Sequence, residues 1–507
     1  MAKICLCLTA KTLKRNLEIL DKYRQWADLA ELRVDCLDPD ERFMIRRFPE
    51  QAGLPVILTI RRTIDGGNFF GGEGARVNLL ARGLAYADAN RRMNFAYVDI
   101  EEDLNVPSLE EAARTFGTRI IRSWHNMDGY TGDIAAKIRG MKCMGDDLVK
   151  IAVRANSTAD VLRILRASRG YSGKEKIFFC TGQYGAYSRI LAEQFGSFLS
   201  YTSAPGENDI VKGCESRIDV QELAELYRFH NISPSTKIFG AVCDGDSLLS
   251  SDAIRYFNAV FKLDDIDAVY APFCADSITN FMELANELNI SGVSVCGSYM
   301  EEAVHFLNEQ FSLVESTGVC DTIFRSAGGW TGTNVIALGW TNSFLEWIGR
   351  KDLRRKKVTL IGGGSMAKII ANELYRLNAG VLILNRSVLK ARHLAGMYKF
   401  TWGGFDNAGI KMMEKYRDII ILAAPEEFEG SGACDPLDMY AFCGREAVME
   451  LVDKPEPSRF LIRAAEAGCR IINGHDAFVR QAHYQYEQFM EKDFPPHILA
   501  RVEFGRS

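Results

Sequence analysis

Short apolar runs recur along the first 230 residues at intervals of roughly 20–35 residues, with helical patterns between them. Each run has the length of a buried strand and is bounded by polar or turn residues. Eight strands that alternate with helices over this length predict an α/β fold, a (β/α)8 TIM barrel. The expected strands are Cys5–Thr9, Leu29–Asp35, Val56–Arg61, Tyr97–Ile100, Arg119–His125, Leu148–Val153, Lys176–Gly182 and Phe198–Tyr201.

The rest of the chain repeats the α/β alternation after a polar break at His230–Thr236. A second strand pattern starts at Lys237. Farther along, a helix and a basic turn over Trp340–Lys357 lead into a strand, a glycine-rich turn and another helix. With 507 residues the chain is too long for a single core, so several domains are expected.

Lys150 interrupts the apolar run 147–153, which otherwise predicts a buried strand. Burial favours the neutral, nucleophilic amine, whereas the alternative is a lysine that snorkels from the strand end to water. Barrel enzymes carry their chemistry at the C-terminal ends of the strands, and polar residues gather there, which favours a functional Lys150. These residues are Glu31, Arg33, Asp35, Arg61, Glu101 and His125.

A lysine that forms an iminium needs a general base, and histidine is the usual choice near neutral pH. His125 ends the fifth expected strand and Lys150 lies on the sixth, so their side chains can meet above the barrel. Glu73, in the glycine-rich loop 66–76, is expected to orient the imidazole. Planar guanidinium groups suited to a carboxylate and hydroxyls come from Arg33, Arg61 and Arg189.

Each of these residues also has a purely structural interpretation. A histidine at a strand end can be a satisfied structural residue, Glu31 and Arg33 can form a plain ion pair, and Arg189 can cap a helix. Their gathering at one end of one barrel favours the functional interpretation, because independent structural roles have no reason to converge there.

Six segments of the first half occur in a characteristic order: Ala-Glu-Leu-Arg-Val-Asp (30–35), Leu-Thr-Ile-Arg (58–61), Ser-Trp-His-Asn (123–126), Leu-Val-Lys-Ile-Ala (148–152), Ser-Arg-Ile-Leu (188–191) and Phe-Gly-Ser-Phe-Leu-Ser-Tyr (195–201). Together they resemble type I 3-dehydroquinate dehydratase. The resemblance implies that Lys150 forms an iminium with the substrate ketone, without a metal or a cofactor. It also implies that His125, oriented by Glu73, removes the C2 proton and protonates the departing C1 hydroxyl. The implied substrate contacts are Glu31, Arg33, Arg61, Arg189 and Ser200.

The end of the barrel departs from this family. The family closes its site with Ala-Pro-Gly-Gln, whereas this chain has Ser-Ala-Pro-Gly-Glu (203–207) and then Gly-Cys-Glu-Ser-Arg (213–217). The closing glutamine is replaced by Glu207 or by Arg217, depending on where the extra residues fall. Arg217 can meet a carboxylate and Glu207 would repel it, so we expect weaker substrate binding with the chemistry retained.

Six segments of the second half also keep a known order: Ile-Asp-Ala-Val-Tyr-Ala-Pro-Phe (266–273), Gly-Val-Ser-Val (292–295), Gly-Val-Cys-Asp-Thr-Ile (318–323), Leu-Ile-Gly-Gly-Gly-Ser-Met-Ala (360–367), Asn-Arg-Ser (385–387) and Ile-Asn-Gly-His-Asp-Ala-Phe-Val-Arg-Gln-Ala (472–482). They resemble shikimate dehydrogenase, here fused behind the dehydratase in a two-lobed α/β region. The implied domains are a barrel over 1–230, a substrate domain over 237–342, a Rossmann nucleotide-binding domain over 343–475, and a helix returning to the substrate domain with the tail over 476–507.

The glycine turn supports this resemblance on physical grounds. Gly362, Gly364 and Ala367 fit G-x-G-x-x-A between a strand and a helix, where small residues let a pyrophosphate approach the helix N-terminus. The next strand ends in Asn385 and Arg386 rather than in an acid. Because an arginine there accommodates a 2′-phosphate, the loop favours NADP. The alternative is a Rossmann-like support domain without a nucleotide.

Two groups of the dehydrogenase chemistry are missing at the matching positions. The family's catalytic lysine falls on Met300 and its aspartate on Ile336, and neither residue transfers protons. Loss of positioned acid–base help costs roughly 10²–10⁴-fold, so we expect impaired reductase activity unless a shifted register brings in Tyr299 or Glu301. The remnants of the substrate site are Ser251, Asn334 and Gln481.

The two resemblances imply small-molecule substrates: 3-dehydroquinate, with 3-dehydroshikimate or shikimate for the second half. A net charge of −5 and a pI near 5.9 argue against general nucleic-acid binding. The sequence shows no membrane-length apolar run and no signal-peptide pattern. The 13 scattered cysteines lack zinc-site spacing, which predicts reduced thiols, no metal and a cytoplasmic protein. No oligomeric state is indicated.

We therefore expect a Schiff-base dehydratase of the shikimate pathway fused to a dehydrogenase-like module. Two alternatives stay open for the second half. One is a fully bifunctional enzyme that also reduces 3-dehydroshikimate with NADP. The other is a non-catalytic ligand-binding or structural module.

Overall fold

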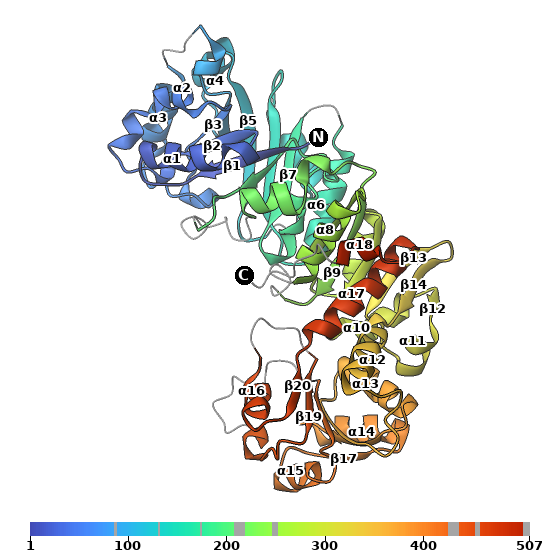
Figure 1. Cartoon of the computed structure of the whole chain (residues 1–507). Helices are drawn as coiled ribbons and strands as arrows, with labels where there is room; N and C mark the ends of the chain where they lie inside the picture. The colour runs from blue at the N-terminus through green and yellow to red at the C-terminus, as the bar shows by residue number, and fades with distance from the viewer. Residues whose placement is uncertain are drawn as a thin grey trace. The chain divides into compact units, whose positions relative to one another are not determined.

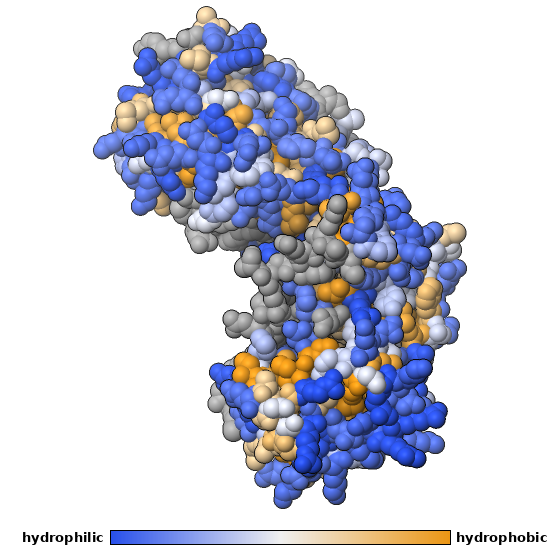
Figure 2. All heavy atoms as spheres, viewed as in Figure 1, coloured by the Kyte–Doolittle hydropathy of each residue, from blue (hydrophilic) through white to orange (hydrophobic). Residues whose placement is uncertain are grey.

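The computed structural model describes residues 1–85, 89–129, 132–172, 175–206, 218–245, 252–423, 436–451 and 457–499. The chain divides into two compact units (Figure 1). The first comprises Met1–Gly240 and Gly245–Ile290, and the second comprises Ala241–Asp244 and Ser291–Ser507. Hydrophilic residues cover most of the face shown in Figure 2. Within the described residues, no helix is both long and apolar enough to cross a membrane.

The predicted parallel barrel is confirmed. Its eight strands pair in the order β7-β6-β5-β4-β3-β2-β1-β8. The ring closes between β8 and β7, where the backbone N–H of Phe198 donates to the carbonyl of Lys176 at 2.6 Å. The strands are β1 (Lys3–Leu8), β2 (Leu29–Arg33), β3 (Val56–Thr59), β4 (Tyr97–Glu101), β5 (Arg119–Asn126), β6 (Leu148–Arg154), β7 (Lys176–Thr181) and β8 (Leu199–Thr202).

Helices alternate with these strands, and polar side chains define where several of them begin. Thr12, Asp133 and Ser157 each accept a hydrogen bond from a backbone N–H of the first helical turn. The helices are α1 (Leu13–Tyr23), α2 (Phe48–Ala52), α3 (Glu73–Leu84), α4 (Pro107–Thr115), α5 (Ile134–Gly140), α6 (Thr158–Gly170) and α7 (Tyr187–Ile190).

The barrel interior has an apolar layer with a polar layer above it. Because side chains alternate along a strand, β6 contributes Leu148 to the lower layer and Lys150 to the layer nearer the C-terminal ends. The apolar layer seals the barrel below the polar groups. It consists of Cys5, Leu29, Ile57, Tyr97, Ile121, Leu148, Ile177 and Leu199.

The chain after the barrel forms a mixed six-stranded sheet in the order β10-β9-β11-β13-β14-β12. Strand β13 runs antiparallel to both β11 and β14. The strands are β9 (Lys237–Cys243), β10 (Ala268–Cys274), β11 (Ile290–Val295), β12 (Glu309–Gln310), β13 (Thr322–Ser326) and β14 (Gly329–Thr333). The helices are α8 (Asp252–Leu263), α9 (Ile278–Glu287), α10 (Tyr299–Glu302), α11 (Ser312–Thr317) and α12 (Val335–Ile348).

A third sheet has six parallel strands in the order β17-β16-β15-β18-β19-β20, which is the strand order of a Rossmann fold. The expected Rossmann lobe is therefore confirmed. Its strands are β15 (Lys357–Ile361), β16 (Gly380–Leu384), β17 (Thr401–Gly403), β18 (Ile419–Leu422), β19 (Ala447–Glu450) and β20 (Arg470–Ile472). Its helices are α13 (Ser365–Arg376), α14 (Val388–Tyr398), α15 (Asn407–Met413) and α16 (Arg459–Glu466), and α17 (His475–Met490) and α18 (Pro496–Leu499) follow.

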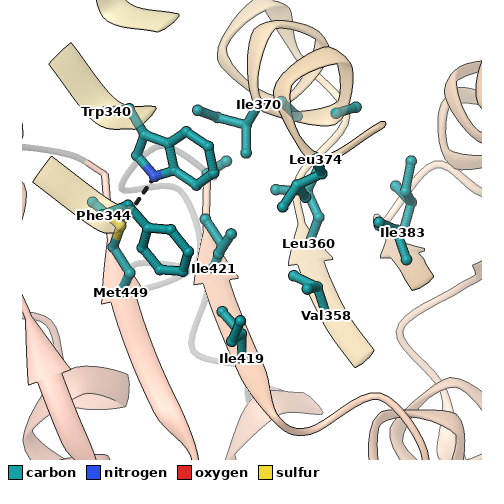
Figure 3. Packing of buried hydrophobic residues seen from close by; sticks show 14 of the residues in the cluster. Trp340, Phe344, Val358, Leu360, Ile370, Leu374, Ile383, Ile419, Ile421 and Met449 are labelled. Carbon is teal, nitrogen blue, oxygen red and sulfur yellow. Dashed lines mark hydrogen bonds between the residues drawn. The ribbon is translucent and has the colours of Figure 1, made fainter. Parts of the chain in front are cut away.

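Apolar side chains fill both faces of this sheet. Leu360 of β15 belongs to the cluster in Figure 3, and its neighbour Ile361 belongs to the cluster on the opposite face. In the first cluster the ring of Trp340 stacks on Phe344 at 4.9 Å, and its indole N–H donates to the sulfur of Met449 at 3.0 Å (Figure 3). The strands of this sheet are apolar at successive positions because both faces of the sheet are buried.

Candidate active site

A cavity opens where the C-terminal ends of the barrel strands meet. It lies above the apolar layer and collects polar groups from several strands, the arrangement expected of a barrel active site. The lining residues are Glu31, Arg33, Arg61, Asp65, Gly66, His125, Met127, Lys150, Ala152, Phe179, Thr181, Arg189 and Tyr201.

Lys150 is buried in the wall of this cavity, with 3% of its surface exposed. Its Nζ donates to Oδ2 of Asp99 at 2.8 Å, and Oε1 of Glu31 lies 4.0 Å away. The face of the Tyr201 ring lies below the amine, with its centroid 4.4 Å from Nζ. The snorkelling alternative does not apply, because the side chain stays inside the barrel.

Asp99 of β4 links the lysine to Arg61. Nη2 of Arg61 lies 2.6 Å from Oδ2 of Asp99, and the hydroxyl of Ser123 donates to Oδ1 at 2.5 Å. Burial alone would raise the pKa of Asp99, but the charges of Arg61 and Lys150 hold it well below its ordinary value. Asp99 is therefore a fixed negative charge that contacts both Arg61 and Lys150.

His125 extends from β5 into the same cavity. Nη1 of Arg61 lies 3.3 Å from its Nδ1, and the same guanidinium nitrogen donates to Glu101 at 2.7 Å. Removal from water, followed by the positive charges of Arg61 and Lys150, holds the pKa of His125 well below its ordinary value. The imidazole is therefore neutral at physiological pH, as a general base must be.

The remaining expected contacts surround this group. Arg33 is held by a two-point ion pair to Asp35, at 3.0 and 2.8 Å. Glu31 accepts from the hydroxyl of Thr59 at 2.9 Å. Arg189 lies 4.7 Å from the centroid of the Phe179 ring and donates to the carbonyl of Tyr201 at 3.3 Å. These contacts set the direction of each charged side chain at the cavity.

Two expected site residues lie outside the cavity lining. Glu73, at the start of α3, pairs with Arg76, whose Nε donates to Oε2 at 3.3 Å, and 45% of the Glu73 side chain is exposed. Ser200 directly precedes Tyr201 on β8, and side chains alternate along a strand, so the two residues point to opposite faces. Glu207 and Arg217 lie outside the described residues.

Sequence reasoning missed two polar residues that line the cavity and one that contacts Lys150 from behind the lining. Asp65 lines it from the turn Thr63–Asp65 and accepts from Nε of Arg62 at 2.7 Å. Tyr201 lines it from β8, and Asp99 holds Lys150. For Asp99 a signal existed, since an acid inside the apolar run 97–100 is as costly to bury as Lys150 itself.

The glycine turn of the Rossmann lobe has the shape of a phosphate cradle. Gly362 has φ of 137°, and a Cβ there would lie 2.8 Å from the carbonyl oxygen of Ala423, so only glycine fits. Gly364 precedes α13, and in the described structure no atom lies within 4 Å of where its Cβ would stand. Ala367 is fully buried in α13. Asn385 follows β16, its amide donating to the carbonyl of Ser387 at 3.2 Å, and Arg386 comes next.

The two positions at which the sequence predicts loss of a proton-transfer pair hold buried apolar residues. Met300 on α10 and Ile336 on α12 expose 6% and 7% of their surface. The backbone N–H groups of Val335 and Ile336 donate to Asp321 at 3.0 and 2.8 Å. Burial raises the pKa of Asp321 to about 6 despite these hydrogen bonds. Asp321 thus anchors the start of α12.

The other remnants and the shifted-register candidates have structural contacts. Asn334 accepts from the N–H of Asp321 at 3.2 Å, and Gln481 is half-buried on α17. Glu301 pairs with Lys368 at 2.7 Å, and Tyr299 is buried. Ser251 lies outside the described residues.

A (β/α)8 barrel that gathers a buried lysine and a histidine in one cavity at the C-terminal strand ends has the arrangement of a barrel enzyme. Residues 4–234 match the family described as type I 3-dehydroquinase, and residues 347–427 match the family described as shikimate/quinate 5-dehydrogenase.

Three relatives illustrate these matches. This chain is 26% identical to the chloroplastic bifunctional 3-dehydroquinate dehydratase/shikimate dehydrogenase of Arabidopsis thaliana, over 98% of this chain and 84% of that protein. Identity is 30% to the 3-dehydroquinate dehydratase of Methanocaldococcus jannaschii, over 45% of this chain and 99% of that protein. It is 28% to the shikimate dehydrogenase (NADP(+)) of Pyrococcus furiosus, over 54% of this chain and 96% of that protein.

The chain belongs to the type I 3-dehydroquinate dehydratase family. It is a lyase of the shikimate pathway, and its barrel is fused to a shikimate-dehydrogenase-like module.

Proposed function

We propose that Lys150 and His125 carry the dehydration of 3-dehydroquinate. The observation that carries this proposal is the buried Nζ of Lys150 in one cavity with a histidine whose pKa is depressed. Lys150 adds to the C3 ketone as the neutral amine, and the carbinolamine takes up a proton and loses water to give an iminium. His125 then takes the C2 proton, and the electron pair of that C–H bond forms an enamine. The enamine expels the C1 hydroxyl, which leaves as water with the proton from His125. Hydrolysis of the new iminium releases 3-dehydroshikimate and the free amine.

The charged groups around the cavity suit the substrate's own groups. Arg33 and Arg189 present guanidinium groups to a carboxylate or to hydroxyls, and Glu31 accepts from a hydroxyl. Arg61 is engaged by Asp99, Glu101 and His125, so its main contribution is to hold the base and the charge cluster in place.

Borohydride trapping tests the iminium. The protein is incubated with 3-dehydroquinate and sodium borohydride, which reduces an iminium to a stable amine, and the adduct is located by peptide mass spectrometry. We expect a single modified residue, Lys150. An adduct on another lysine, or normal turnover without any adduct, would rule out the proposed mechanism.

We propose Asp65, rather than Glu73, as the carboxylate that orients His125. Asp65 lines the same cavity as His125, whereas Glu73 is not among its lining residues. A hydrogen bond to a charged group contributes about 1.5–3 kcal/mol, so Asp65→Asn is expected to lower kcat about 10- to 100-fold. Glu73→Gln is the matched control and is expected to stay within about twofold. Steady-state kinetics with 3-dehydroquinate compare the two variants. A larger loss of kcat in Glu73→Gln than in Asp65→Asn would show that Glu73, and not Asp65, orients His125.

For the second half we propose a module that binds NADP(H) but transfers hydride poorly. The turn of Gly362 and Gly364 supports this proposal, because glycines there let a pyrophosphate approach the N-terminus of α13. Arg386 follows β16 and is the residue that we propose for the 2′-phosphate. When bound, NADPH supplies the hydride. Reduction of a ketone also needs a proton donor from the protein. The side chains of Met300 and Ile336 are buried and apolar, so neither can donate that proton.

Two measurements separate this proposal from its alternatives. NADPH oxidation with 3-dehydroshikimate is expected to run roughly 10²–10⁴-fold below a competent shikimate dehydrogenase measured in parallel. Comparable turnover would establish the bifunctional alternative. NADPH fluorescence is expected to show saturable binding, and a flat titration would leave only a structural or ligand-binding module.

The remaining expectations complete the proposal. We place the domains at residues 1–230, 237–342, 343–475 and 476–507. Shikimate or 3-dehydroshikimate is the small molecule that suits the second half. The cytoplasm is the proposed compartment.

A further inference from the structure

Tyr201 has a buried hydroxyl that the described residues leave unpaired. The residue exposes 3% of its surface and lines the active-site cavity from β8. Its Oη has no hydrogen-bond partner among the described residues. A buried hydroxyl without a partner costs free energy, and such orphans in a cavity wall are the groups that a ligand pairs with.

The ring of Tyr201 faces the amine that reacts. Nζ of Lys150 lies 4.4 Å from the ring centroid, within the range in which an aromatic face stabilises a cation. The amine becomes a positively charged iminium during the proposed reaction, so this attraction persists through the covalent step. Phe179 packs at 5.7 Å against the same ring and holds its orientation.

The hydroxyl stays a neutral donor at any working pH. Burial, followed by the negative charge of Glu31, raises the pKa of Tyr201 well above its ordinary value. A neutral phenol both donates and accepts, so it can pair with a hydroxyl or carbonyl oxygen of a substrate attached to Lys150.

We infer that Tyr201 is a substrate-contacting residue of the dehydratase: its hydroxyl hydrogen-bonds an oxygen of the bound substrate, and its ring stabilises the iminium on Lys150. This inference rests on the proposed function of Lys150. Neither the hydroxyl nor the ring takes part in bond breaking.

Two variants separate the hydroxyl from the ring. Tyr201→Phe removes only Oη and is expected to lower kcat/KM for 3-dehydroquinate about threefold to tenfold. Tyr201→Leu also removes the aromatic face. This second variant is expected to lower kcat/KM about tenfold further and to reduce the yield of the borohydride adduct on Lys150. Tyr187→Phe is the matched control, because Tyr187 of α7 also has a buried hydroxyl without a partner in the described part of the chain but does not line this cavity. It is expected to match the wild type.

The outcomes distinguish the role of Tyr201 from the proposed iminium mechanism of Lys150. If the wild-type protein turns over normally but gives no borohydride adduct, both the iminium mechanism and the role of Tyr201 are overturned. If the adduct forms on Lys150 but Tyr201→Phe stays within about twofold of the wild type, only the role of Tyr201 is overturned. Should Tyr201→Leu unfold, as circular dichroism would show, the nearly isosteric Tyr201→Phe still decides the question.

Discussion

Replacing Lys150 with methionine is expected to lower kcat for 3-dehydroquinate dehydration by about 10⁴- to 10⁶-fold, because Lys150 is the only amine among the described residues that line the cavity. The borohydride adduct should disappear with the activity. The fold should persist, because Asp99 keeps its ion pair with Arg61 at 2.6 Å and is not left as an unpaired buried charge.

Lys176→Met provides the matched control for this prediction. Lys176 is another lysine of the barrel, half-buried at the start of β7, and it donates to backbone carbonyls of Ser168 and Tyr171. This variant is expected to keep activity and adduct formation. Turnover and thermal unfolding measured on both variants separate loss of chemistry from loss of fold. Substantial activity in Lys150→Met would mean that the reaction does not pass through this amine.

Replacing His125 with asparagine is expected to lower kcat about 10²- to 10⁴-fold, the range for loss of a positioned general base. Trapping of the first iminium should continue, because the amine of Lys150 is untouched. His230→Asn is the matched control, since His230 lies elsewhere in the first unit and bonds Asp28 at 2.8 Å. The two variants are compared by kinetics and by adduct yield.

The pH profile of the wild-type protein gives a second check on His125. A general base is active when neutral, and activity is lost as the pH falls through its pKa. Burial and the charges of Arg61 and Lys150 hold that pKa well below its ordinary value. We therefore expect kcat/KM to stay flat as the pH falls through about 6.5, the usual value for histidine. An acid limb centred there would contradict the environment that the structure gives to His125.

The barrel was predictable because its signal is local. Apolar runs of strand length that alternate with helical patterns can be recognised in the sequence alone. The observed strands lie within one or two residues of the expected positions, as for β1 at Lys3–Leu8. The Rossmann lobe was predictable for the same reason, since the turn at Gly362 needs a backbone conformation that glycine adopts. Lys150 was visible because a charge stands in an apolar run.

Other parts of the site depend on distances that no local pattern contains. Asp99 and Lys150 are 51 positions apart and belong to β4 and β6, and they meet only because the barrel closes. Ser200 and Tyr201 are neighbours in sequence, but the pleat decides which one faces the cavity. The path of the loop after β3 decides that Asp65 reaches the lining while Glu73 pairs with Arg76.

The sequence by itself determined the two kinds of fold, the presence of a lysine in a buried strand with a histidine on the strand before it, and the absence of acid–base groups at residues 300 and 336. These features depend on periodicity and residue type, which are local. The tertiary structure decided that Asp99 and Arg61 surround Lys150 with a fixed charge pattern, that Asp65 and Tyr201 line the cavity, and that Glu73 and Ser200 do not. Charges and hydrogen bonds act through space, so only the closed barrel shows which of them share one cavity.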